Sequence, residues 1–148
     1  MIGQHKNIAL VAHDRKKTDL LDWVQYNQET LRQHSLFATG TTGTLIEQTL
    51  KTPITKFNSG PLGGDQQIGS RISEGIIDLL IFFWDPMESL SHDTDIKALL
   101  RISVVWNIPV ANNRITADYL ISSPLFSRAY INQTPDYSTY LQRKTQVM

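Results

Sequence analysis

The sequence predicts a three-layer α/β/α sandwich built on a five-stranded, mainly parallel, doubly wound sheet. Five short apolar runs are typical of strands, and they lie at residues 7–12, 36–38, 54–57, 76–84 and 108–111. Apolar positions at helical spacing separate these runs, and strands that alternate with helices form parallel sheets through right-handed crossovers. With 148 residues, 41% of them hydrophobic and 19% charged, the chain has the size and composition of one globular domain, which we expect to cover residues 1–148.

The first strand and helix set the pattern. Residues 7–12 (NIALVA) are almost all apolar, as in a parallel strand that is covered on both faces. From Thr18 the apolar positions have helical spacing as far as Leu31, and Asp19 complements the positive end of the helix dipole.

Two glycine-rich loops follow the second and third strands. Residues 39–43 (TGTTG) form a predicted tight loop before a helix over 44–50. Residues 59–64 (SGPLGG) form a second loop before a helix over 65–74, which Gly75 ends.

The second half of the chain repeats the alternation. Residues 76–84 contain the most hydrophobic strand, which we expect at the centre of the sheet, and a polar loop follows it as far as His92. Helices are predicted over 96–105 and 116–121, and after Pro124 the pattern weakens.

Charge and cysteine content exclude several classes of function. Fourteen basic and fourteen acidic residues give a net charge of zero, so we expect no nucleic-acid or membrane partner. The absence of cysteine excludes disulfides and thiolate chemistry. The apolar stretch 79–84 is too short to span a bilayer, and residues 1–6 are too short and polar for a signal peptide, so we expect a cytoplasmic protein.

Polar residues gather where the predicted strands end. Ligands of doubly wound sheets bind at the carboxyl ends of the strands, near the point where strand order reverses. The residues that follow strands are His13, Asp14, Lys17, the loops 39–43 and 59–65, Asp85, and the cluster from His92 to Asp95. We therefore expect the site at this edge.

The loop of Thr39, Gly40, Thr41 and Thr42 suits a phosphate, because glycines let backbone N–H groups converge and hydroxyls donate hydrogen bonds. A capped helix after a glycine turn explains the same residues equally well. The loop is neither a P-loop nor a dinucleotide fingerprint, since both spacings are missing.

Asp65, His13, His92 and Asp95 are the candidates for acid and base chemistry. Taken alone, Asp65 is more simply explained as a helix N-cap, and the other three as residues of a solvated loop or a helix start. His and Asp can also bind metal, but no metal-binding spacing is present, so we expect neither a metal nor a cofactor.

The chain resembles the methylglyoxal synthase family over nearly its whole length. The resemblance rests on residues 38–43 (ATGTTG), 59–67 (SGPLGGDQQ), 82–86 (FFWDP) and 106–111 (WNIPVA), together with the His13-Asp14 and His92-Asp93 pairs. It implies a carbon-oxygen lyase that converts dihydroxyacetone phosphate (glycerone phosphate) to methylglyoxal and inorganic phosphate through an enediolate, in the methylglyoxal bypass of glycolysis.

The resemblance also implies residue roles. Asp65 would be the catalytic base, with His92 polarising the substrate, His13 contacting it, and Asp14, Asp85 and Asp95 in support. The substrate phosphate would be held by Lys17, Thr39, Gly40, Thr41, Thr42, Ser59 and Gly60.

The resemblance further implies a homohexamer that phosphate inhibits cooperatively, in which Arg143 or Lys144 could reach a neighbouring subunit. Two other functions remain open from the sequence. One is a non-catalytic sensor of phosphate or a small effector, like the regulatory domain of carbamoyl phosphate synthetases. The other is a phosphosugar isomerase.

Overall fold

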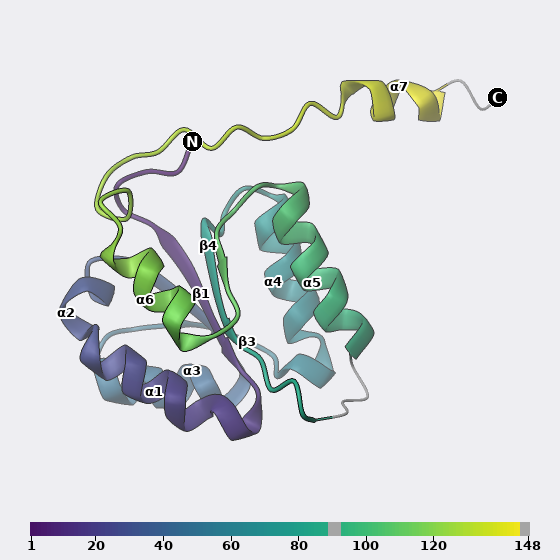
Figure 1. The fold of residues 1–148 in the computed structure, drawn as a ribbon. Coiled ribbons are helices and arrows are strands. Elements are labelled where there is room, and N and C mark those ends of the chain that lie inside the picture. The colour runs from purple at the N-terminus through teal and green to yellow at the C-terminus, as the bar shows by residue number, and fades with distance from the viewer. Residues whose placement is uncertain (89–92, 146–148) are drawn as a thin grey trace.

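The computed structural model describes residues 1–88 and 93–145 and has the predicted α/β architecture (Figure 1). Its strands are β1 (Asn7–Ala12), β2 (Ser35–Thr39), β3 (Thr55–Phe57), β4 (Leu79–Phe83) and β5 (Val110–Ala111). Its α-helices are α1 (Lys17–Tyr26), α2 (Gln28–Leu31), α3 (Gly40–Leu50), α4 (Gly64–Ser73), α5 (Asp93–Val105), α6 (Arg114–Ser122) and α7 (Ser138–Thr145). Short 3-10 helices occupy Asp14–Lys16 and Gly60–Leu62.

The five strands form one sheet in the order β3-β2-β1-β4-β5, and every pairing is parallel. The chain first winds outward from β1 to β3 and then crosses to β4 and β5 on the other side. Strand order therefore reverses between β1 and β4, which is where doubly wound sheets bind ligands. The predicted fold class is confirmed.

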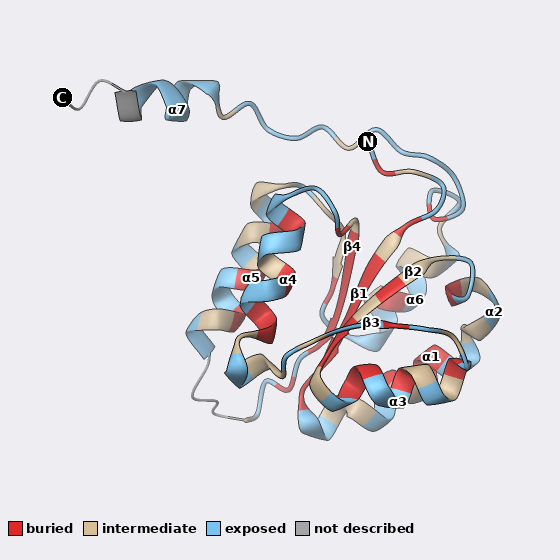
Figure 2. Ribbon diagram, turned by 180° about the vertical axis from the view of Figure 1, so that it is seen from behind, coloured by how far each residue is buried: buried red, intermediate tan, exposed pale blue. Residues whose placement is uncertain are grey.

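Helices cover both faces of the sheet (Figures 1 and 2). Alternate residues of β1 point to opposite faces, so Ile8 and Leu10 belong to a core with α1, α3 and α6. Ala9 and Val11 belong to the other core, with α4 and α5. The buried strands in Figure 2 lie between these helical layers.

Three sequence expectations about the elements were wrong. The central strand is β1, whereas the more hydrophobic β4 lies beside it. All five residues of β4 are buried because helices cover both faces, and this burial does not depend on being central. Residues 40–43 form the first turn of α3 and not a separate loop, because Gly40 at φ +51° turns the chain directly from β2 into the helix. The helix expected from Thr18 to Leu31 is divided at Asn27, whose side chain donates to the carbonyl of Trp23 at 2.9 Å.

The remaining differences lie at the ends of elements and after Pro124. β4 and β5 are shorter than the apolar runs 76–84 and 108–111 that predicted them. Gly63, at φ +102°, is the N-cap of α4, so Asp65 is the second residue of the helix and not its cap. Gly75 has φ +75° just after α4, as a helix terminator should. The sequence did not predict α7, because the apolar pattern is weak after Pro124. This helix lies away from the body of the protein in Figure 1. Across residues 1–88 and 93–145, no helix combines the length and apolarity needed to cross a membrane.

Candidate active site

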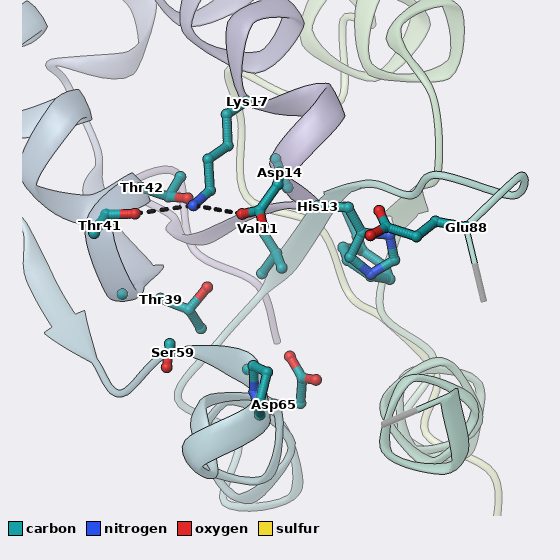
Figure 3. Close-up of a pocket in the computed structure, with 15 residues that line it drawn as sticks. Val11, His13, Asp14, Lys17, Thr39, Thr41, Thr42, Ser59, Asp65 and Glu88 are labelled. Atoms are coloured by element: carbon teal, nitrogen blue, oxygen red, sulfur yellow. Dashed lines mark hydrogen bonds and ion pairs between the residues drawn. The ribbon is translucent and has the colours of Figure 1, made fainter. Parts of the chain in front are cut away.

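A cavity of about 210 Å³ opens at the carboxyl ends of β1, β2 and β3 (Figure 3). Its lining residues come from segments far apart in the sequence. They are Val11, Ala12, His13, Asp14, Lys17, Thr39, Gly40, Thr41, Thr42, Ser59, Gly60, Pro61, Asp65, Phe82 and Glu88. Val11, Ala12 and Phe82 come from the ends of β1 and β4, and the polar members come from the end of β2, the loops and the helix starts.

The first turn of α3 forms one wall. The backbone N–H groups of a helix's first turn have no partner within the helix, and the helix dipole makes this end positive. Thr39 is the N-cap, but its side chain makes no capping hydrogen bond, so its hydroxyl is not used for that purpose. Thr39 and Thr42 are buried, at 6% and 2% exposure. This wall can accept an anion such as phosphate.

Two glycines bring the Ser59 turn against this wall. A Cβ on Gly40 would lie 3.1 Å from both the Cα and the Cβ of Ser59, and Gly40 also has a positive φ. A Cβ on Gly64 would lie 1.9 Å from the carbonyl oxygen of Asn58. Only glycine permits both approaches, so the glycine-rich sequence serves to close the cavity around a small ligand.

Lys17 supplies the cation of the cavity. Its ammonium forms an ion pair with Oδ1 of Asp14 at 2.9 Å and donates to Oγ1 of Thr41, also at 2.9 Å. The hydrogen bond and the charge of Lys17 lower the pKa of Asp14, which is itself well exposed. Asp14 and Thr41 thus hold Lys17 beside the start of α3, where it adds to the attraction for an anion (Figure 3).

His13 is held by the loop after β4. It is 8% exposed, and its Nδ1 accepts a hydrogen bond of 2.9 Å from the backbone N–H of Asp85. An Nδ1 that accepts carries no proton, so the neutral ring carries its proton on Nε2 and can donate from there. The ring edge also packs on Phe82, with centroids 5.1 Å apart. His13 is therefore a fixed, neutral hydrogen-bond donor at the cavity.

Asp65 is a buried carboxylate, 3% exposed, in the first turn of α4. Figure 3 shows it across the cavity from Lys17 and Thr41. The N-terminal turn of a helix stabilises negative charge. A carboxylate fixed in this way, facing an anion-binding wall at a distance, can remove a proton from the part of a ligand that lies away from its phosphate.

The structure brings together ten of the predicted site residues in this cavity: His13, Asp14, Lys17, Thr39, Gly40, Thr41, Thr42, Ser59, Gly60 and Asp65. His92 lies outside the described residues. Asp95 is half-buried in the first turn of α5 and is not among the lining residues of the described cavity.

Asp85 is buried, and its Oδ1 accepts from the backbone N–H of Met87 at 3.0 Å. Its Oδ2 has no hydrogen-bond partner among the described residues. Sequence reasoning missed Glu88, which lines the cavity beside His13 (Figure 3). Glu88 could have been predicted to lie at the site from its place in the polar loop that follows β4. Within the described ranges, no group of three His, Cys, Asp or Glu side chains could hold a metal ion.

The fold and the cavity together define an α/β domain of the MGS-like class, and the model of the family described as "MGS-like domain" matches residues 19–112. Methylglyoxal synthase of Erwinia tasmaniensis is 58% identical over 97% of this chain and 94% of the relative. That of Coxiella burnetii is 57% identical over 93% and 96%. The crystal structure of methylglyoxal synthase from Elizabethkingia anophelis NUHP1 superposes with a TM-score of 0.90 at 53% identity, covering 96% of this chain and 93% of that one. The chain belongs to the methylglyoxal synthase family.

Proposed function

We propose that this protein is a carbon-oxygen lyase that converts dihydroxyacetone phosphate to methylglyoxal and inorganic phosphate. The family to which the chain belongs supports the reaction. One observation supports assigning the reaction to particular residues. Buried Asp65 lies across a small cavity from Lys17 and the first turn of α3.

The substrate phosphate binds at the first turn of α3, with Lys17 and the Ser59-Gly60 turn around it. Phosphate binding in this position orients the rest of the substrate toward Asp65. The cavity of about 210 Å³ suits a triose phosphate better than a nucleotide.

Asp65 removes a proton from the carbon that bears the hydroxyl group, and an enediolate forms. The Nε2–H of His13 donates to a substrate oxygen, and donors of this kind stabilise charge that develops in the transition state. The C–O bond to phosphate then breaks, phosphate leaves with the bonding electrons, and the resulting enol rearranges to methylglyoxal. His92 and Asp95 assist this proton chemistry, and Asp85 supports His13 through its backbone N–H.

The assembly and its control belong to the same proposal. The protein acts in the cytoplasm as a homohexamer of single-domain chains, and phosphate, the product, inhibits it cooperatively. The position of α7 away from the cavity of its own chain supports a role for Arg143 at a neighbouring subunit (Figure 1). The side chain of Lys144 lies outside what the structure describes.

The test is to incubate the purified protein with dihydroxyacetone phosphate and measure methylglyoxal and free phosphate. Equal amounts of the two products are expected. Glyceraldehyde 3-phosphate as the product would indicate an isomerase, and phosphate binding without turnover would indicate a sensor. Either outcome contradicts the proposal.

A further inference from the structure

A second cavity, of about 320 Å³, lies at the opposite edge of the sheet from the catalytic cavity. It opens at the amino ends of β1 and β4, between the end of α6 and the chain that follows it. Its lining residues are Ile2, Lys6, Leu79, Asn107, Ile108, Pro109, Leu120, Ser123, Leu125, Phe126, Tyr130 and Asn132. Among the residues that the structure describes, none lines both this cavity and the catalytic cavity, and the proposed reaction makes no use of this second cavity.

Two segments close this cavity, the N-terminal residues and the chain around Tyr130. The backbone N–H and C=O groups of Ile2 and Tyr130 exchange two hydrogen bonds of 2.8 Å in an antiparallel bridge. Ile2 and Phe126 are buried, at 5% and 6% exposure. The bridged residues Ile2 and Tyr130 therefore form a strap over the cavity. The walls of the cavity are mostly aliphatic and aromatic.

Lys6 is the charged residue of these walls, and it is only 4% exposed. Its ammonium donates to the carbonyls of Gly3 at 3.0 Å and Arg128 at 3.1 Å, and it lies 5.7 Å from the ring centroid of Phe126. An ammonium has three N–H donors, and the third finds no acceptor among the described residues. Burial lowers the pKa of Lys6, while the charge of Asp78 acts to raise it.

The described residues that line this cavity carry one positive charge and no negative charge. Lys6 is the only lysine or arginine among the residues that line this cavity, and no aspartate or glutamate lines it in the part of the chain that the structure describes. Asp78 lines a neighbouring cavity, which shares Ile2, Ile108 and Asn132 with this one, and its carboxylate accepts from the backbone N–H of Asn7 at 2.8 Å. A ligand of matching chemistry therefore carries one negative charge and a body that is otherwise apolar.

We propose that this cavity binds a small monocarboxylate with an aliphatic or aromatic body. The carboxylate accepts the third N–H of Lys6, and the amide groups of Asn107 and Asn132 complete the polar end. The apolar body lies against Ile108 and Phe126.

Two simpler explanations fit less well. A lysine that served only to connect the N-terminal residues to the segment around Arg128 would account for the bonds to Gly3 and Arg128. It would not account for the cavity beside it or for the third donor. A phosphate site would need more donors, whereas a single ammonium and apolar walls suit one carboxylate. A cavity closed by the strap and lined by a buried cation is typical of a ligand-binding site, whereas a lysine that only stabilises the fold needs no cavity.

Isothermal titration with hexanoate, in excess inorganic phosphate to occupy the catalytic cavity, tests the proposal on the full chain. Hexanoate should bind, and 1-hexanol, which has the same body without the charge, should bind about tenfold or more weakly. Lys6→Met should weaken hexanoate binding by a similar factor. The matched control Lys97→Met, which changes an exposed lysine of α5 that lines neither cavity, should not change it.

Leu125→Trp provides a second variant in case Lys6→Met does not fold, since Leu125 lines the cavity and is half exposed. The larger side chain should fill the cavity and abolish hexanoate binding. The proposal is wrong if hexanoate does not bind the unmodified protein, if hexanol binds equally well, or if Leu125→Trp binds hexanoate as tightly as the unmodified protein. It is equally wrong if Lys97→Met weakens hexanoate binding as much as Lys6→Met does.

Discussion

Gly64→Ala is expected to damage both stability and turnover. The added Cβ would lie 1.9 Å from the carbonyl oxygen of Asn58 and 2.9 Å from Cγ2 of Thr39. Ordinary contact begins at about 3.4 Å, so the Asn58 carbonyl must move by roughly 1.5 Å. Asn58 precedes Ser59, and Thr39 lines the cavity, so this displacement alters the wall that faces Asp65.

The magnitude follows from two opposing effects. Overpacking of this kind costs up to about 3 kcal/mol, and the better helix propensity of alanine returns about 1 kcal/mol. The net loss of about 2 kcal/mol lowers the melting temperature by roughly 4–8 °C in a protein of this size. A displacement of about 1 Å in a catalytic arrangement reduces turnover by roughly 100-fold.

Gly69→Ala is the matched control in the same helix, because its Cβ would meet only Cγ2 of Ile102, at 3.7 Å. We expect this variant to gain up to about 1 kcal/mol and to keep full activity. Calorimetry and a methylglyoxal assay on both proteins provide the comparison. If Gly64→Ala melted at the same temperature as Gly69→Ala and turned over as fast, the close approach of α4 to the Ser59 turn would not matter, and the reasoning would fail.

Three other changes test separate parts of the account. Lys17→Met should weaken the binding of inorganic phosphate by about tenfold or more in a titration, because it removes the cation held by Asp14 and Thr41; unchanged affinity would place the phosphate elsewhere. Glu88→Gln should tighten phosphate binding by roughly two- to fivefold, because it removes a like charge from the cavity lining, and weaker binding would show that Glu88 helps to hold the anion. Burial, with smaller effects of His5 and Lys6, lowers the pKa of His34 to about 4, below its unfolded value of 6.5. The unfolded chain therefore binds the proton first, and roughly 1–2 kcal/mol of stability is lost as pH falls from 6.5 toward 4. His34→Asn keeps an acceptor for the backbone N–H of Lys6 and should flatten this part of a pH series of urea denaturations, whereas an unchanged slope would assign the loss to other groups.

The alternation of apolar runs and helical spacing was sufficient to predict the layers and the parallel sheet. Strand order was not predictable in the same way. Helices cover both β1 and β4, so both strands have apolar sequences, and these sequences do not show which strands pair with each other. Helix starts were also hard to predict, because Gly40 and Gly63 act through positive φ angles that depend on the packing around them.

The candidate site was largely predictable because parallel strands bring their carboxyl ends to one edge. The N-cap interpretation of Asp65 was wrong for a local reason, since Gly63 takes that position and Asp65 is the second residue of the helix. The tautomer of His13 could not be predicted, because it depends on a bond to Asp85, which is distant in sequence. Lys6 gave no signal either, since nothing in the sequence distinguishes a buried lysine from an exposed one.

The role of Asp65 as base is the central claim, and one variant tests it most directly. Asp65→Asn should remain folded and bind inorganic phosphate, yet form methylglyoxal at least about 100-fold more slowly and fail to exchange the substrate's carbon-bound hydrogen with deuterated water. Asp19→Asn, on the exposed side of α1, should behave as the unmodified protein does. Turnover and exchange at the unmodified rate in Asp65→Asn would contradict the account and move the base to another carboxylate, with Asp95 the first to examine.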